Sequence, residues 1–165
     1  MISVRHYPEL VTPALRAWLR AFVTYDADGR GSCWLATIGK EAEALPAMLK
    51  GIADAVAPGR IWSGALLQCY RDGEAGTPCH TDASGTGFGF ILSLGAPRTF
   101  RVHRVPSGAS GCGDYDLDAA LVQCIEGTVL VMDEDFQRGW HHQIVLDLGI
   151  VGEKLSLVFR TKPGG

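Results

Sequence analysis

A histidine and an aspartate stand two residues apart in the stretch TPCHTDASG, residues 77–85. Side chains alternate between the two faces of a strand, so His80 and Asp82 would project from one face, about 6 to 7 Å apart along the chain. An imidazole nitrogen and a carboxylate oxygen that converge in this way can bind a divalent metal ion. Cys79 should point to the opposite face of the strand, so we do not expect it to bind the same ion.

Two adjacent histidines in GWHHQIV, residues 139–145, offer a third ligand. Alternation puts His142 on the more apolar face, with Trp140 and Ile144, and His141 on the more polar one. A histidine on a strand often has only a structural role, packed in the core or exposed to solvent. The residues alone therefore do not show whether either histidine binds a metal ion. Two histidines and one carboxylate fill three positions of an octahedral ion and leave three vacant. Such a set suits non-haem Fe(II) better than a closed structural zinc site.

A cationic segment near the C-terminal end, EKLSLVFRT (residues 153–161), offers a place for a co-substrate. Alternation puts Lys154, Ser156 and Arg160 on one face and apolar side chains on the other. This pattern fits a half-buried strand with a solvated charged face, and it also fits a pocket wall that binds a carboxylate. A 2-oxo acid can chelate iron through its keto oxygen and adjacent carboxylate, and Lys154 or Arg160 would then meet its far carboxylate.

The spacing of apolar residues predicts two amphipathic helices, at residues 8–23 and at about residues 41–56. From residue 61 onward, short apolar or alternating runs are separated by glycine-containing turns. Many short strands of this kind are typical of a sandwich or barrel rather than of a parallel α/β sheet. We therefore expect a mainly β fold of the α+β class, with the two helices outside a double sheet and the longest loop at residues 106–119.

Size and charge limit the possible functions. With 165 residues, 47% of them hydrophobic, the chain can bury one substantial core, and we expect a single domain over residues 1–165. A formal net charge of −3 means that only a local basic patch could bind nucleic acid. The first residues lack the apolar run of a signal peptide, and five widely spaced cysteines argue against a disulfide framework. We expect reduced thiols in an intracellular protein, cytoplasmic or, in a eukaryote, nuclear.

Taken in order, these motifs resemble the AlkB-like iron and 2-oxoglutarate-dependent dioxygenases. The resemblance runs from about Gln68 to Thr161 and includes the segments CYRDGEAGTPCHTD, ILSLGAPRTFRVHR, EGTVLVMD, WHHQ and KLSLVFR. It is greatest to the branch that removes alkyl lesions from nucleic-acid bases. Members of that branch show a Tyr-x-Asp-Gly turn, a Ser-x-Gly strand, a Trp-x-His motif and a terminal Phe-Arg. His-x-Asp alone is a weak signal, whereas the ordered set is a specific one.

The resemblance implies a double-stranded β-helix, or jelly roll, with Fe(II) as the metal and 2-oxoglutarate as the co-substrate. It selects His142 over His141, so the implied iron ligands and catalytic residues are His80, Asp82 and His142. The residues implied to surround 2-oxoglutarate are Gln68, Tyr70, Lys154, Ser156 and Arg160. Most members have an arginine at the place of Lys154, and a lysine lacks the two-pronged geometry of a guanidinium. The apolar walls that limit solvent are expected to include Leu92, Leu94, Leu130 and Trp140.

Candidates for substrate contact are Trp34, Ser84, Arg98 and Arg101. Trp34 could stack on a base or belong to the core. Ser84 follows the His-x-Asp motif, where base-repairing relatives often carry a further acidic residue. The basic residues of RTFRVHR, residues 98–104, offer a patch for phosphates, although a solvated edge strand explains them equally well.

We therefore expect an Fe(II)- and 2-oxoglutarate-dependent dioxygenase that uses O2 for oxidative dealkylation of N-alkylated bases, a demethylase of the DNA-repair type. Flipping a base out of a duplex costs a few kcal/mol, so a small acidic enzyme should prefer single-stranded DNA or RNA. A monomer without membrane association is expected. Two alternatives remain. One is a hydroxylase or demethylase acting on a protein side chain or small metabolite, and the other is a non-catalytic jelly-roll binding module.

Overall fold

The computed structural model describes residues 2–37, 45–82, 87–104 and 119–162 of the chain. Ser84, most of the predicted loop at residues 106–119 and the expected start of the second helix at residue 41 lie outside these ranges. Within them, no helix is long and apolar enough to cross a membrane.

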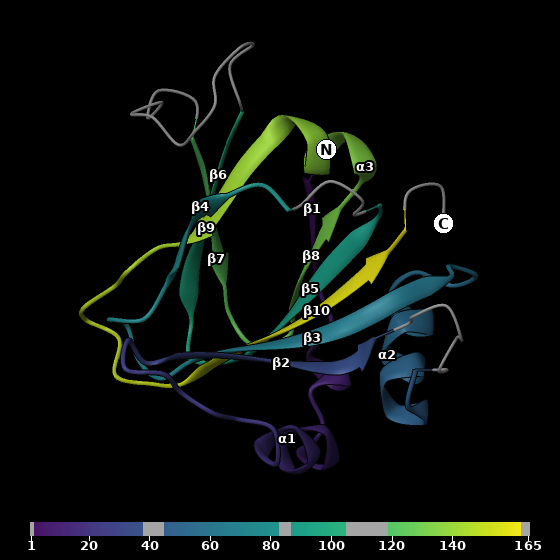
Figure 1. The fold of residues 1–165 in the computed structure, drawn as a ribbon, viewed down its shortest axis with the longest axis horizontal. Helices are drawn as coiled ribbons and strands as arrows, with labels where there is room; N and C mark the ends of the chain where they lie inside the picture. The colour runs from purple at the N-terminus through teal and green to yellow at the C-terminus, as the bar shows by residue number, and fades with distance from the viewer. Residues whose placement is uncertain (1, 38–44, 83–86, 105–118, 163–165) are drawn as a thin grey trace.

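A six-stranded antiparallel sheet forms the larger layer of the fold (Figure 1). In spatial order its strands are β1 (Ile2–His6), β8 (Thr128–Met132), β5 (Gly89–Gly95), β10 (Lys154–Thr161), β3 (Trp62–Tyr70) and β2 (Arg30–Thr37). The strand nearest the C-terminus, β10, thus lies in the middle of the sheet, between β5 and β3. This central position explains why both faces of β10 are buried.

A four-stranded antiparallel sheet faces the larger one (Figure 1). Its strands are, in spatial order, β4 (Thr77–His80), β9 (Trp140–Ile144), β6 (Arg98–Arg104) and β7 (Ala120–Cys124). Two facing antiparallel sheets with few helices make a jelly-roll fold, so the expected fold class is confirmed. The strands expected from residue 61 onward are all present as strands.

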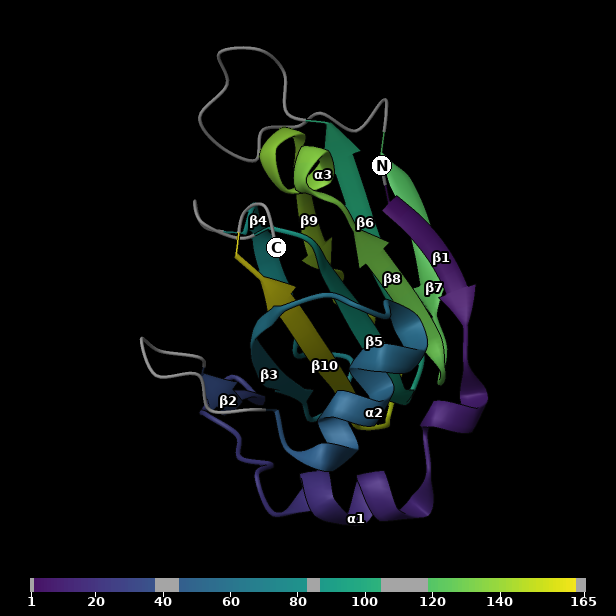
Figure 2. The same ribbon diagram turned by 90° about the vertical axis from the view of Figure 1, so that its right-hand side faces the viewer.

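Two helices, α1 (Pro13–Arg20) and α2 (Ala47–Val56), lie against the outer face of the larger sheet (Figures 1 and 2). Helix α1 is shorter than predicted because Thr12 is extended before Pro13, and its side chain accepts a hydrogen bond from the Leu15 amide at 3.1 Å. The residues before it form only a short 3-10 turn, η1 (Pro8–Leu10). A third helix, α3 (Glu134–Gly139), was not predicted, because six residues are too few to show helical periodicity.

Two apolar clusters fill the two sides of the larger sheet. Leu157 and Phe159 of β10 pack with the helices, whereas Val158 of the same strand packs between the two sheets. The predicted alternation of β10 is thus confirmed. The alternative of a solvated polar face is wrong, because the smaller sheet covers the face of β10 that carries its polar side chains. The space between the sheets is where β4, β9 and β10 bring their polar residues together.

Candidate active site

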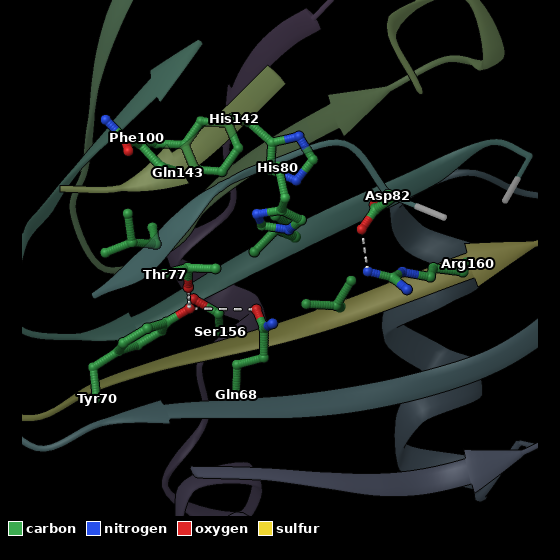
Figure 3. Close-up of a pocket in the computed structure, with 13 residues that line it drawn as sticks. Gln68, Tyr70, Thr77, His80, Asp82, Phe100, His142, Gln143, Ser156 and Arg160 are labelled. Carbon is green, nitrogen blue, oxygen red and sulfur yellow. Dashed lines mark hydrogen bonds and ion pairs between the residues drawn. The ribbon is translucent and has the colours of Figure 1, made fainter. Parts of the chain in front are cut away.

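A pocket of about 360 Å³, its open mouth included, lies between the two sheets. Figure 3 shows the side chains that line it. They are Gln68, Tyr70, Thr77, His80, Asp82, Ile91, Phe100, His142, Gln143, Ile144, Ser156, Val158 and Arg160.

The three predicted metal ligands converge at this pocket. His80 on β4 and His142 on β9 are directly opposite each other in the antiparallel ladder, with ring centroids 4.4 Å apart. Asp82 follows β4, and one potential ligand atom from each of the three residues lies within 4.8 Å of the other two. His141 lies on the other face of β9, where it pairs with His103 of β6. The geometry therefore selects His142, as the resemblance did.

Hydrogen bonds prepare two of these ligands for a metal ion. His80 Nδ1 is 2.7 Å from the Pro78 carbonyl oxygen, so Nδ1 carries the proton and Nε2 is left as the ligand atom. Arg160 Nη2 donates to Asp82 Oδ1 at 2.5 Å, which orients the carboxylate and leaves Oδ2 for an ion. Burial lowers the pKa of His142 to about 4, so its ring is neutral near pH 7 and can act as a ligand.

A cluster of neutral polar groups lies at the other end of the pocket (Figure 3). The Tyr70 hydroxyl is 2.5 Å from Thr77 Oγ1 and 3.5 Å from Gln68 Oε1. Burial raises the pKa of Tyr70 to about 12, so its phenol keeps its proton and can donate a hydrogen bond. Ser156 on β10 completes this cluster from the neighbouring strand.

Several polar atoms of the pocket are buried without a hydrogen-bond partner among the described residues: Ser156 Oγ, Arg160 Nε and His142 Nδ1. A buried polar group without a partner costs about 1–3 kcal/mol, so such groups are normally satisfied by a partner or a ligand. Ser156 and Arg160 are thus two donors on β10 that lie beside the three potential metal ligands. This arrangement fits an anionic co-substrate that would also bind the metal ion. The residues present therefore fit Fe(II) and 2-oxoglutarate.

Lys154 lies deeper than the other residues implied to bind 2-oxoglutarate. It is fully buried and does not line the pocket, and its Nζ donates to the Cys124 carbonyl oxygen at 3.2 Å. Burial lowers the pKa of Lys154 to about 8. Its side chain lies on the same face of β10 as Ser156 and Arg160. Lys154 is therefore a buried cation on this face, beyond Ser156.

The candidate substrate residues occupy different surroundings. Trp34 on β2 is 51% exposed, and its cross-strand partner is Leu66 of the inter-sheet cluster, so it lies on the pocket-facing side of the sheet edge. Arg98 is fully buried and donates to the Pro97 and Gly152 carbonyl oxygens, so its prediction as part of an exposed basic patch is wrong. Arg101 points to the opposite face of β6 and is half-buried.

The predicted apolar walls were wrong, because none of the four residues named for them lines the pocket. Leu92 and Leu94 pack against the helices on the far side of the larger sheet. Leu130 and Trp140 belong to the inter-sheet cluster without lining the pocket. The apolar lining is instead Ile91, Phe100, Ile144 and Val158. Strand β5 is buried on both faces, so its sequence gives no polar alternation from which its inner face could be read.

Sequence reasoning also missed two residues with specific roles in the pocket. Thr77 is the near partner of the Tyr70 hydroxyl, and Phe100 stacks on His142 with 5.4 Å between ring centroids. Thr77 opens the same strand as His80, three residues earlier, and Phe100 lies in the alternating strand β6. Their positions were visible in the sequence, but only the pairing of β4, β6 and β9 shows what they contact.

Comparison with curated proteins finds two similar sequences, both named alpha-ketoglutarate-dependent dioxygenase alkB homolog 3. The protein from Rattus norvegicus is 28% identical over 109 residues, which are 62% of this chain and 36% of that protein. The protein from Homo sapiens is 26% identical over 108 residues, which are 62% of this chain and 37% of that protein. The chain thus matches little more than a third of the length of either relative. No protein-family profile matches the sequence.

Comparison with solved structures identifies the fold. An oxidoreductase of the 2OG-Fe(II) oxygenase family from Burkholderia pseudomallei superimposes with a TM-score of 0.58 at 15% identity, covering 96% of this chain and 82% of that one. A prolyl-4-hydroxylase from Pseudomonas putida also gives a TM-score of 0.58, at 18% identity, covering 99% of this chain and 93% of that one. The chain thus has the fold of these 2OG-Fe(II) oxygenase structures and is similar in sequence to the two alkB homolog 3 proteins.

Proposed function

We propose that this protein is an Fe(II)- and 2-oxoglutarate-dependent dioxygenase that oxidatively removes N-alkyl groups from nucleic-acid bases, with single-stranded DNA or RNA as its preferred substrate. The observation that carries the proposal is the convergence of His80, Asp82 and His142 at a pocket with unpartnered polar donors. When bound, Fe(II) and 2-oxoglutarate supply the oxidation chemistry, in which O2 is consumed and the co-substrate becomes succinate and CO2.

The chain's own residues bind and orient the reactants. His80, Asp82 and His142 hold the metal and leave half of its coordination positions for ligands. Arg160 holds the Asp82 carboxylate in one orientation and keeps its Nε for the co-substrate. Gln68, Tyr70 and Ser156 supply hydrogen-bonding groups at the polar end, and Lys154 supplies the buried positive charge behind them.

Two observations favour a nucleic-acid base as the substrate. The curated relatives are alkB homolog 3 proteins, and the sequence motifs are those of the base-repair branch. Trp34 presents an exposed indole on the pocket-facing side of β2, where a base could stack. Stacking is worth about 1–3 kcal/mol per base, comparable to the cost of holding an unpaired base outside its strand.

The structural likeness to a prolyl-4-hydroxylase favours a second candidate, oxidation of a protein side chain. Release of formaldehyde from methylated oligonucleotides separates the two candidates, because an enzyme that oxidises a protein side chain would leave the methyl group of the base in place. The test incubates the protein with Fe(II), 2-oxoglutarate and O2 and supplies a panel of N-methylated single-stranded oligonucleotides, measuring formaldehyde and succinate together.

We expect formaldehyde in stoichiometric proportion to succinate with at least one methylated base. Trp34→Ala should lower the rate at least tenfold, whereas Ile61→Ala, which removes another exposed apolar side chain, should leave it unchanged. Succinate without formaldehyde on any oligonucleotide would favour the protein-side-chain candidate. No succinate under any condition would contradict an oxygenase altogether and favour the binding module.

A further inference from the structure

A second cluster of metal-ligating side chains lies on the outer face of the smaller sheet. Cys79 on β4, His103 on β6 and His141 on β9 each offer a ligand atom within 4.8 Å of the other two. The three strands are neighbours in the order β4, β9, β6 (Figure 2). His103 and His141 are directly opposite each other in the ladder, and their rings meet edge to face with centroids 5.3 Å apart.

This cluster is separate from the candidate active site. Cys79 and His141 are the chain neighbours of His80 and His142, and consecutive residues of a strand point to opposite faces. His80 and His142 therefore face the pocket, while Cys79 and His141 face away from it. One sheet thus carries two sets of ligands, back to back.

The two histidines of the cluster are more buried than an outer-face position requires. His103 is 4% exposed and His141 is 8% exposed, and the Nδ1 atom of each is buried with no hydrogen-bond partner in the described part of the chain. Burial lowers the pKa of His103. The Nδ1 atom of each buried ring thus lacks a partner, whereas His103 Nε2 lies beside Cys79 Sγ.

The distance between the Cys79 and His103 ligand atoms fits zinc. A sulfur and a nitrogen bound to one tetrahedral Zn²⁺ at about 2.3 and 2.1 Å lie about 3.6 Å apart. Cys79 Sγ and His103 Nε2 are 3.6 Å apart in the structure. One thiolate and two imidazoles are a donor set for Zn²⁺, whereas two imidazoles and one carboxylate at the other site suit Fe(II).

Cys79 is disulfide-bonded in this structure, so the sequence-based expectation of reduced thiols is wrong for this residue. Among the described residues, the free cysteines are Cys33, Cys69 and Cys124. A thiol or phosphine reductant would supply the two electrons that open the disulfide, giving two thiols with two protons from solvent. Loss of the Cys79 proton then gives the thiolate that a metal ion needs.

We propose that, in the reduced protein, Cys79, His103 and His141 bind one Zn²⁺ ion, with water as the fourth ligand, and that this ion fastens β4, β9 and β6 together behind the iron ligands. A small-molecule disulfide, which takes up two electrons and is reduced to two thiols while Cys79 re-forms its own disulfide, removes the thiolate and releases the ion. The site would thus be structural in the reduced state and lost in the oxidised one.

Co²⁺ is the probe, because a cobalt-thiolate bond gives a charge-transfer band in the near ultraviolet that an iron-type site of two histidines and an aspartate cannot give. The metal-free full chain is titrated with Co²⁺ after reduction with a phosphine and, separately, without reduction. We expect the band to appear in the reduced protein, to be absent without reduction, and to disappear when Zn²⁺ is added.

Variants assign the band to the cluster. Cys79→Ser should abolish it, and His103→Asn should weaken Co²⁺ binding at least tenfold. Thr99→Val on the same face of β6, Cys33→Ser and His80→Ala should all retain it. Should Cys79→Ser not fold, mass spectrometry of native Cys79 after alkylation gives the same information, because bound Zn²⁺ should slow the modification of Cys79 at least tenfold. A reduced, folded chain without the band, a band that survives Cys79→Ser, or alkylation unaffected by Zn²⁺ would overturn the proposal.

Discussion

At the scale of single residues, Ser156 carries a buried hydroxyl without a partner, whereas Ser63 donates its hydroxyl to the Arg160 carbonyl oxygen at 2.9 Å. Replacing Ser156 with Ala should raise the free energy of unfolding of the ligand-free protein by about 1 kcal/mol, because an unsatisfied group is removed. The same change should weaken 2-oxoglutarate binding about tenfold.

Ser63→Ala is the matched control and should lower the free energy of unfolding by about 1 kcal/mol. Urea unfolding and calorimetric titration measure the two effects. Lower stability in Ser156→Ala with unchanged 2-oxoglutarate affinity would show that this hydroxyl has only a structural role.

The buried ammonium of Lys154 makes stability depend on pH. Burial lowers the pKa of Lys154 to about 8, while in an unfolded chain it is near 10.4. Between these values the unfolded state binds more protons than the folded state, so this residue makes the free energy of unfolding rise with pH from about 8 to about 10. Below about pH 8 both states are protonated and the full cost of burying the charge remains.

Lys154→Met should therefore be more stable than the native chain at pH 7, with the difference shrinking between about pH 8 and 10. Charged or titratable groups that act on Lys154 are Cys124 and Arg98, and comparing the two proteins at each pH cancels their own titration. Urea unfolding across this range makes the measurement, with Lys50→Met, on the exposed face of α2, as control. Parallel stability curves for the native and Lys154→Met proteins would contradict a buried charge.

Individual residues show how far the sequence could lead. Strand alternation was enough to place His80 with Asp82 and to turn Cys79 away from them, because the period of two is fixed by the backbone. It could not choose between His141 and His142, since both faces of β9 are buried. It also could not reveal that Arg98 is enclosed at the end of β6, because basic residues are usually exposed.

At the scale of elements, the turn after β3 depends on a glycine. A Cβ at Gly73 would lie 1.7 Å from the Asp147 carbonyl oxygen, on the segment that joins β9 to β10. Gly73 also exchanges backbone hydrogen bonds with that segment, donating to the Ile150 carbonyl oxygen at 2.9 Å and accepting from the Asp147 amide at 2.8 Å. This turn therefore holds the connection between β9, which carries His142, and β10, which carries Lys154 and Arg160.

Gly73→Ala should lower the free energy of unfolding by about 1–3 kcal/mol, because backbone atoms must move to admit the methyl group. Gly51→Ala on α2 is a control with the opposite sign. No atom lies within 4 Å of its added Cβ, so it should stabilise the protein by about 1 kcal/mol through helix propensity. Thermal unfolding of both variants makes the comparison. A stable Gly73→Ala protein would mean that the two segments are not in close contact.

Elements with a clear apolar pattern in the sequence could be predicted. Elements whose formation depends on pairing with a distant strand could not. Strands β3, β5, β8 and β10 are apolar runs that could be read directly. Strand β1 is mostly exposed, and its polar sequence gave no signal until its pairing with β8 was seen. Helix α1 was predicted too long because apolar residues on both sides of Pro13 continue its pattern without continuing the helix.

At the scale of the whole molecule, a formal net charge of −3 limits binding to nucleic acid. Three phosphate contacts on a single strand, at about 0.7 each, give a slope of about −2 in a plot of log affinity against log salt. Arg16→Gln on the distant α1 should leave this slope unchanged. Fluorescence anisotropy with a methylated oligonucleotide, single-stranded and in duplex, makes the measurement. Equal affinity for both strand states without salt dependence would contradict a nucleic-acid substrate.

The overall topology explains why this fold can hold such a site. Ligands separated by some 60 residues in sequence, on β4 and β9, become neighbours only because these strands pair in the smaller sheet. Mainly β composition and the two helices could be predicted from periodicity. The order of the strands in the sheets could not be predicted, because pairing between distant segments leaves no local pattern in the sequence. The expectation of a jelly roll came from the resemblance.

Anaerobic addition of Fe(II) and 2-oxoglutarate tests the central claim most directly. If His80, Asp82 and His142 hold iron beside a co-substrate site, the native protein will develop a weak visible metal-to-ligand charge-transfer band. Asp54→Ala, which removes a carboxylate exposed on α2, will retain this band, and Asp82→Ala will lose it. A folded native protein without the band, or the band at full intensity in Asp82→Ala, would contradict the account.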